Sequence, residues 1–300
     1  MKKVFLSVFF ALLGISLMAQ APVTLKLNLE KGKVYTAKSA SKQTVKIDAA
    51  GQQFNIDVFS NNVVTYKVLK QENDIMDVEL KFDTIASKSN SPMGSKETNS
   101  AKPNMSDPME RIMNKISTST IVAKISTGGK FVDFVNYPKF KDRVLFVLDS
   151  IPAGKRDQAK MVADALVQES AVRTRIEPLF AYLPEKAVKT GDSWESTYSL
   201  SANNATLLSL NTFTLKGVAS NVATVSGKSE IESLPSNDPA AQMTQNLKGT
   251  ITSDGTVDVA TGLTLKNTAK GHIEGTMTVK ANNSEMKIQL DTESETIMIK

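Results

Sequence analysis

The sequence predicts a mainly β protein of the β-rich α+β type, with two antiparallel β-meanders and a central helical block. Apolar and polar residues alternate over most of the chain, which is typical of half-buried strands. Gly and Asn turns separate these segments. One stretch, residues 137–184, has helical spacing instead. We expect the meanders to form one curved sheet or half-barrel, or else two packed sheets, with the helices covering one face.

The N-terminus has the order of residues found in a secretory signal peptide. Lys2 and Lys3 precede an apolar run over residues 4–17, which ends in Met-Ala-Gln. The run is shorter than the roughly 20 apolar residues of a membrane-spanning helix. We expect cleavage after Ala19, a signal peptide over residues 1–19, and a mature protein that is periplasmic or extracellular.

Composition excludes several classes of protein and site. The chain has no Cys, so it cannot be a lipoprotein, form disulfides or bind zinc through thiolates. Its basic residues form no long cluster, so we expect no nucleic-acid partner. No second apolar stretch reaches membrane length, and we therefore expect no transmembrane segment in the mature chain.

The first meander is expected over residues 20–136. Residues 86–107 are rich in Ser, Asn, Lys and Pro, and this composition predicts a mobile loop. Asp107-Pro108 has the residues of a helix start and predicts a short helix to about Ile116. The expected strands are Val23–Leu29, Val34–Ile47, Phe54–Leu69, Ile75–Ile85, Thr120–Ser126 and Lys130–Val135.

The central block, residues 137–184, is expected to contain two helices, Tyr137–Ile151 and Arg156–Leu183, separated by Pro152 and Gly154. One interpretation is that they simply pack on the sheet. The other is that they form a lid over an apolar cavity. In that case the ligand-facing stripe would consist of Phe140, Val144, Leu148, Met161, Val162, Ala165, Val172 and Ile176.

The second meander is expected over residues 185–300, and the two halves contain similar segments in the same order. This similarity indicates a duplication, although β-hairpins also resemble one another because turn chemistry recurs. The matching pairs are Glu30–Tyr35 with Lys189–Trp194, Val64–Val68 with Phe213–Gly217, and Ile125–Asp133 with Ile251–Asp258.

No residue can be assigned to catalysis, a cofactor or a metal from the sequence. Trp194, the only Trp, is either an exposed binding aromatic or a core anchor at the start of a strand. The single His, His272, lies in a strand pattern and is expected to be structural or exposed. A hydrolase using carboxylates alone remains an alternative, and it would require two carboxylates facing each other in one pocket.

Three features resemble an uncharacterised family of secreted Bacteroidota proteins, a domain of unknown function. They are the Leu-Met-Ala-Gln end of the signal peptide, the strand openings Gly32–Tyr35 and Gly191–Trp194, and the helical block. The resemblance implies no activity and no site residues. The expected architecture is also distantly similar to the half-barrels of periplasmic lipoprotein carriers, at the level of fold alone.

These observations favour an exported, non-catalytic binding or carrier protein for an apolar, lipid-like ligand, without a cofactor. The alternative is a structural or protein-interaction module of the cell envelope that binds no small ligand. In that case residues 86–107 would be the segment that contacts another envelope protein.

Overall fold

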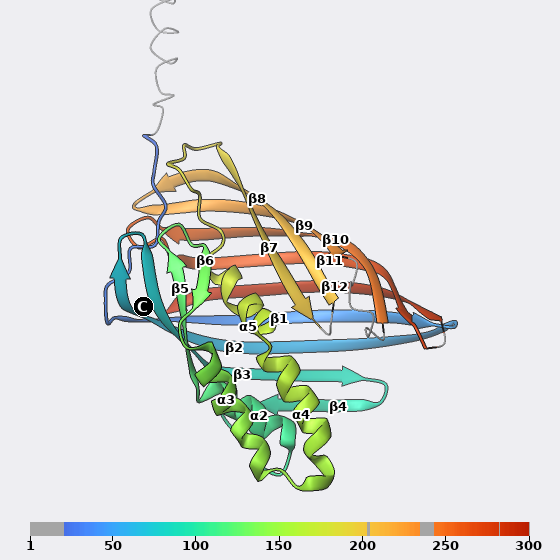
Figure 1. Cartoon of the computed structure of the whole chain (residues 1–300). Coiled ribbons are helices and arrows are strands. Elements are labelled where there is room, and N and C mark those ends of the chain that lie inside the picture. The colour runs from blue at the N-terminus through green and yellow to red at the C-terminus, as the bar shows by residue number, and fades with distance from the viewer. Residues whose placement is uncertain (1–20, 203–204, 235–242, 282, 300) are drawn as a thin grey trace, which may run out of the picture.

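The computed structural model describes residues 21–202, 205–234, 243–281 and 283–299, so the expected signal peptide lies outside the described residues. One large antiparallel sheet dominates the fold (Figure 1). Its strands are β1 (Val34–Ala49), β2 (Gln52–Glu72), β3 (Ile75–Ser91), β4 (Gly94–Asn99), β5 (Thr120–Ser126), β6 (Phe131–Phe134), β7 (Ser193–Ala202), β8 (Ala205–Ala219), β9 (Val222–Leu234), β10 (Met243–Asp258), β11 (Thr264–Val279) and β12 (Ser284–Ile299).

The two meanders are continuous with each other through the pairing of the first strand with the last. The order across the sheet is β6-β5-β3-β2-β1-β12-β11-β10-β9-β8-β7, with β4 paired to β3. The β1–β12 register runs from Thr36↔Ile299 to Ala49↔Met286. The sheet is not closed into a barrel, because β6 and β7 remain its two ends. A single curved β-sheet is thus confirmed, and the alternative of two packed sheets is wrong.

The helices lie on one face of the sheet (Figure 1). Among them, α2 packs on β3 and β4, α3 packs on β5, and α5 packs on β7. On α5, the Arg173 guanidinium also lies 4.8 Å from the Phe131 ring of β6. The helix α5 therefore contacts both open edges of the sheet. The helices and short 3-10 turns are α2 (Pro108–Ser117), α3 (Tyr137–Leu145), η1 (Phe146–Ser150), α4 (Ala153–Val167), α5 (Glu169–Ile176) and η2 (Glu177–Leu179).

The predicted mobile loop over residues 86–107 is wrong in its first part. Strand β3 continues to Ser91 and turns into β4, which pairs with it from Ala86↔Asn99 to Ser91↔Gly94. The Ser87 and Thr98 hydroxyls are hydrogen-bonded at 3.0 Å across this hairpin. A polar segment can form strands when its backbone is paired and neither face has to be buried.

The helix expected after the polar segment is confirmed. Asp107 caps α2, and its Oδ1 accepts a hydrogen bond from the Met109 amide at 2.7 Å. Pro108 occupies the first helical position, where its missing N–H has no cost.

The strand expected over Val23–Leu29 does not form. Only Val23 makes an isolated bridge, to Val188. The alternation was nonetheless informative, because Leu25, Leu27 and Leu29 are all buried. Leu27 N–H donates to the Thr127 carbonyl at 2.8 Å, in a turn of the first meander. The segment is therefore an extended tie that contributes to the core without joining the sheet.

The helix expected over Arg156–Leu183 is interrupted. Gln168 has φ −54° and ψ 138°, an extended conformation that ends α4 and starts α5. The buried face of α4 consists of Ala159, Ala163 and Val167. Small residues on this face allow the helix to approach its neighbours closely.

The two meanders begin with the same turn. Gly32 and Gly191 have φ of 83° and 92°, a region that favours glycine. Their amides donate to the carbonyls of Val68 and Leu215 at 2.9 and 2.8 Å. The turns that open β1 and β7 are therefore held by β2 and β8 in the same way.

The aromatic residues after these turns also correspond. Tyr35 lies opposite Tyr66, and Trp194 lies opposite Phe213. The structure thus aligns Tyr66 with Phe213, whereas the sequence match aligned it with Leu215.

The third sequence match, between Ile125–Asp133 and Ile251–Asp258, also differs in register from the structural correspondence. The Thr127 amide donates to the Asp74 carbonyl, and the Val259 amide donates to the Asn221 carbonyl in the same place. Thr127 therefore corresponds to Val259 rather than to Ser253. The repeated contacts support a duplication, with a register that the sequence alone misaligned.

Candidate functional site

The two faces of the sheet differ sharply in charge. Strand pairing places Ser39, Thr296, Asn267 and Gly255 in one row on the inner face, which is the face toward the helices. The same alternation holds along β1, β2 and β7–β12. Within the part of these strands whose side chains are described, the inner face carries no charged residue.

The outer face carries the charges of the same strands. One row there joins Lys42, Glu293, Lys270 and Lys228 through Thr252. Lys270 Nζ lies 2.9 Å from Glu293 Oε1, and both side chains are mostly exposed. Charges on this face remain hydrated, which avoids the cost of burying them. The uncharged inner face of the curved sheet, formed by β1, β2 and β7–β12, is called the trough below.

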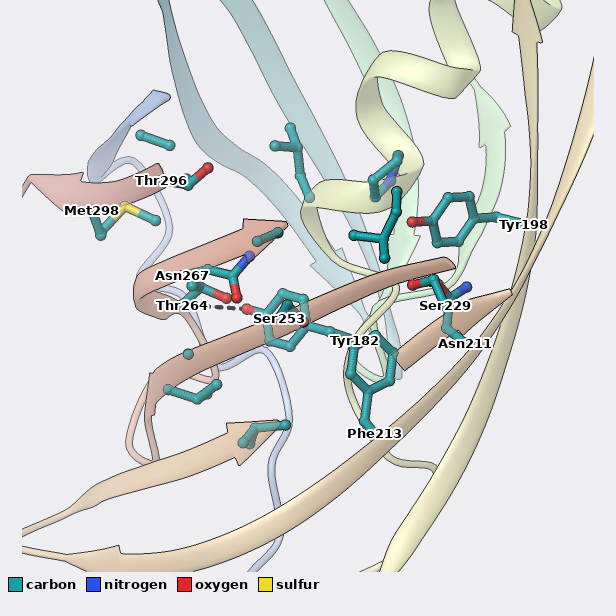
Figure 2. A pocket seen from close by; sticks show the side chains of 18 of the residues that line it. Tyr182, Tyr198, Asn211, Phe213, Ser229, Ser253, Thr264, Asn267, Thr296 and Met298 are labelled. Carbon is teal, nitrogen blue, oxygen red and sulfur yellow. Dashed lines mark hydrogen bonds between the residues drawn. The ribbon is translucent and has the colours of Figure 1, made fainter. Parts of the chain in front are cut away.

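A cavity of about 300 Å³ occupies the covered end of this trough (Figure 2). This is the lower end of the range for small-molecule sites. Its roof is the segment that follows α5, which contributes Pro178, Leu179 and Tyr182. Its walls are inner-face residues of the sheet: Ala37, Tyr66, Tyr198, Asn211, Phe213, Val225, Ser229, Ile251, Ser253, Gly255, Val257, Thr264, Asn267, Ala269, Thr296 and Met298.

Tyr182 fixes the roof to the sheet. Its hydroxyl donates to the Gly262 carbonyl at 2.6 Å and accepts from the Thr264 amide at 2.9 Å. Burial raises the pKa of the Tyr182 hydroxyl to about 12. Burial also raises the pKa of Tyr198, on the opposite wall. Burial also raises the pKa of Tyr66, the third phenol of the lining, so all three phenols are neutral at physiological pH and the whole lining is uncharged.

Apart from the tyrosines and Thr264, the polar side chains of the lining fall into two sets. The first set is satisfied internally: Asn211 donates to the Ser196 carbonyl at 3.0 Å and accepts from the hydroxyls of Ser209 and Ser229. The second set consists of Ser253, Asn267 and Thr296. Their side chains make no hydrogen bond to any residue that the structure describes.

Trp194 lies behind the cavity wall and is half-buried. Its indole Nε1 donates to the Tyr182 carbonyl at 3.0 Å, and its ring lies 6.0 Å from that of Phe213. This placement agrees with the interpretation of Trp194 as a core anchor. It also puts the only Trp in contact with two residues of the lining.

None of the eight residues of the predicted helical stripe lines the cavity. Met161 is 71 % exposed, and Ala165 is also exposed. Val162 is half-buried at a second hollow between α2 and α4. The other five are buried in the core beneath the helices, namely Phe140, Val144, Leu148, Val172 and Ile176.

Sequence reasoning missed the residues that do line the cavity. The signal that could have found them is that every second residue is uncharged along eight strands, β1, β2 and β7–β12. These positions can be recognised in the sequence because successive side chains of a strand point to opposite faces. The helical roof is formed by the end of the block rather than by its apolar stripe.

His272 lies on the outer face, as expected for an exposed His. Its Nδ1 lies 2.7 Å from Asp291 Oδ1, and this hydrogen bond raises the pKa of the imidazole. Among the described residues, no group of three or more His, Asp or Glu could hold a metal ion. In the same part of the chain, no helix combines the length and apolar character needed to cross a bilayer.

The fold and cavity define a class: a mainly β protein with one open, curved sheet and an uncharged inner trough. The chain belongs to a family of unknown function, DUF6263, whose model matches residues 73–264. No curated protein matches the chain.

Solved structures with a similar course are distant. A lipovitellin structure, described by its lipid–protein interactions, shares 9 % identity at a TM-score of 0.48, over 91 % of this chain and 26 % of its own. This chain thus spans about a quarter of that protein. An outer membrane channel from Pseudomonas putida F1 shares 8 % identity at a TM-score of 0.29, over 91 % and 98 %. A DUF1329 family protein from Desulfovibrio piger shares 10 % identity at a TM-score of 0.13, over 84 % and 83 %.

Proposed function

We propose that this protein is an exported, non-catalytic binding or carrier protein for an apolar, lipid-like ligand that lies in the trough. The observation that carries the proposal is the separation of charge between the two faces of the sheet. Export rests on the signal-like order of residues 1–19.

The inner face extends beyond the covered cavity. Along β12, the inner residues Met286, Ile288 and Leu290 are half-buried, whereas the outer residues between them are exposed. Their neighbours on β11 include Ile273 and Met277. An apolar chain lying on this surface would gain about 0.8 kcal/mol for each CH2 group removed from water. The trough therefore suits an elongated apolar ligand with one end in the cavity.

A carrier role is favoured over catalysis by the chemistry of the lining. Acid–base chemistry uses titratable groups with pKa values near the working pH. The described residues of the cavity offer instead hydroxyls, amides and three tyrosines with raised pKa values. The facing pair of carboxylates that a hydrolase would need is not found in this lining.

One observation favours the second candidate function, a protein-interaction module. The β3–β4 hairpin lies at the edge of the sheet, where β3 stays paired with β2 as far as Asn90, and Met93 at its turn is 96 % exposed. An exposed apolar tip on a paired hairpin could contact another envelope protein. Co-purification of a partner that is lost on deleting residues 92–93 would support this function.

The ligand-binding proposal can be tested by blocking the cavity. Ala269→Phe places a bulky ring in the lining, and Thr268→Phe places the same ring on the outer face of β11. Protein would be exported in a bacterial host, purified, and examined by native mass spectrometry with organic extraction.

We expect wild type and Thr268→Phe to carry a stoichiometric mass that extracts as lipid, and Ala269→Phe to lack it. Circular dichroism would confirm that both variants fold. A clean apo mass for the wild type, together with no uptake of added lipid, would contradict the proposal.

A further inference from the structure

We infer that the ligand has an uncharged polar head, such as an alcohol or an ester, held by Ser253, Asn267 and Thr296. This inference rests on the proposed function and specifies the chemical class of its ligand. It concerns the covered end of the trough, where these three side chains line the cavity together (Figure 2).

The three residues come from adjacent strands at neighbouring positions. Asn267 of β11 lies directly opposite Thr296 of β12 on one side and Gly255 of β10 on the other. Ser253 is two residues from Gly255 and points to the same face. Asn267 and Thr296 are directly opposed, which places their Cβ atoms about 5 Å apart, whereas Ser253 is the diagonal neighbour of Asn267, at about 7–8 Å. A small polar head beside the Asn267 amide therefore lies between the two hydroxyls.

Two glycines leave space beside these polar groups. A Cβ at Gly255 would lie 2.9 Å from Asn267 Oδ1, and one at Gly227 would lie 2.5 Å from Ser253 Oγ. Any other residue at these positions would crowd the amide or the hydroxyl. The polar atoms therefore remain accessible from within the cavity.

The hydrogen-bonding capacity of the three side chains fits a neutral head. A hydroxyl and an amide can each donate and accept, so together they match an alcohol or a carbonyl oxygen. A carboxylate or phosphate would need a cation, because an unpaired charge is costly to bury. The described lining has no Lys, Arg or His.

Arg175 of α5 is a buried cation in the helix that precedes the roof of the cavity, so its relation to the head of the ligand has to be examined. Burial lowers the pKa of its guanidinium, which still remains charged at physiological pH. Its Nη1 donates to the Leu166 carbonyl at 2.9 Å, and the residue is not part of the lining. Arg175 thus holds α4 and α5 together, whereas the head of the ligand faces uncharged groups.

The test compares ligands with the same chain and different heads. Quenching of Trp194 fluorescence would report binding of 1-hexadecanol, methyl palmitate, palmitate and hexadecyl phosphate at pH 8, each below its aggregation limit. We expect the alcohol and the ester to bind at least tenfold more tightly than the two anions. Asn267→Val should weaken binding of the alcohol by about three- to tenfold, since one hydrogen-bonding group is lost. Thr268→Val, on the outer face, should not weaken it.

The outcomes separate this inference from the proposed function. If none of the four ligands binds, the trough is not a lipid site and the proposed function fails with the inference. If the anions bind as tightly as the alcohol, the trough binds lipids but the inference is overturned. A loss of palmitate binding in Arg175→Gln would overturn it as well, because the head would then lie at the guanidinium.

Discussion

The hydroxyl of Tyr182 offers a direct test of how the roof is held on the sheet. Replacing Tyr182 with Phe keeps the ring in the lining and removes only the oxygen. That oxygen bridges the Thr264 amide and the Gly262 carbonyl, at 2.9 and 2.6 Å. Both groups would lose this partner when the oxygen is removed.

The expected cost follows from these two bonds. A buried polar group left without its partner costs about 1–3 kcal/mol. Two such groups, with partial relaxation or entry of a water molecule, give about 2–4 kcal/mol for Tyr182→Phe. Tyr35→Phe serves as a matched control, because the Tyr35 hydroxyl accepts one bond, from the Glu30 amide at 3.0 Å. Its expected cost is about 1 kcal/mol.

Equilibrium urea unfolding followed by circular dichroism would measure both variants. An unchanged denaturant slope would show that the free energies of unfolding are comparable. The argument would be refuted if Tyr182→Phe lost less than about 0.5 kcal/mol, or lost no more than Tyr35→Phe. The roof would then be held by apolar packing rather than by the hydroxyl.

Three further predictions concern pH, the helical core and one turn. Because the folded-state pKa of Tyr182 is about 12 and the ordinary value is 10.0, the unfolded chain loses this proton first. The contribution of Tyr182 to the free energy of unfolding should therefore be fully present below pH 10 and fall by about 3 kcal/mol as pH rises through 12. Unfolding titrations should show a shallower fall in Tyr182→Phe than in the wild type, and parallel curves for the two proteins would contradict the raised pKa of Tyr182. Ile176→Ala, in a fully buried position, should cost about 2–5 kcal/mol, whereas Met161→Ala, 71 % exposed, should stay within about 0.5 kcal/mol in the same urea assay. Gly129→Ala should cost more than about 1 kcal/mol, because φ is 80° and a Cβ would lie 2.1 Å from a backbone carbonyl oxygen, whereas Gly154→Ala meets no atom within 4 Å and should be neutral or stabilising; equal thermal midpoints for these two variants would speak against strain at the turn.

Local chemistry made several features predictable from the sequence. Asp107-Pro108 defines a helix start because its carboxylate satisfies free amides and proline needs no amide partner there. Gly32 and Gly191 define turns because the left-handed region favours glycine. In each case the signal lies within a few residues, so no distant contact was needed to interpret it.

Other features depended on distant partners and were misassigned. The β3–β4 hairpin consists of polar residues that form strands because β3 pairs with β2 as well as with β4. Leu25 and Leu27 alternate like strand residues but are buried without joining the sheet. On α4, the apolar pattern around Met161 suggested the wrong buried face. The residues that are buried are the smaller Ala159, Ala163 and Val167. In these cases tertiary contacts determined the structure, and a local sequence pattern does not contain information about such contacts.

The sequence by itself determined the strand-rich class, the helical block and the alternation that leaves one face of β1, β2 and β7–β12 without charge. Period-two geometry makes that alternation a property of the chain alone. Only the tertiary structure decided which strands are neighbours, and so placed Ser253, Asn267 and Thr296 side by side in one cavity. The physical reason is that register between β10, β11 and β12 is set by pairing over the whole sheet, and by the segment through Tyr182 that covers it.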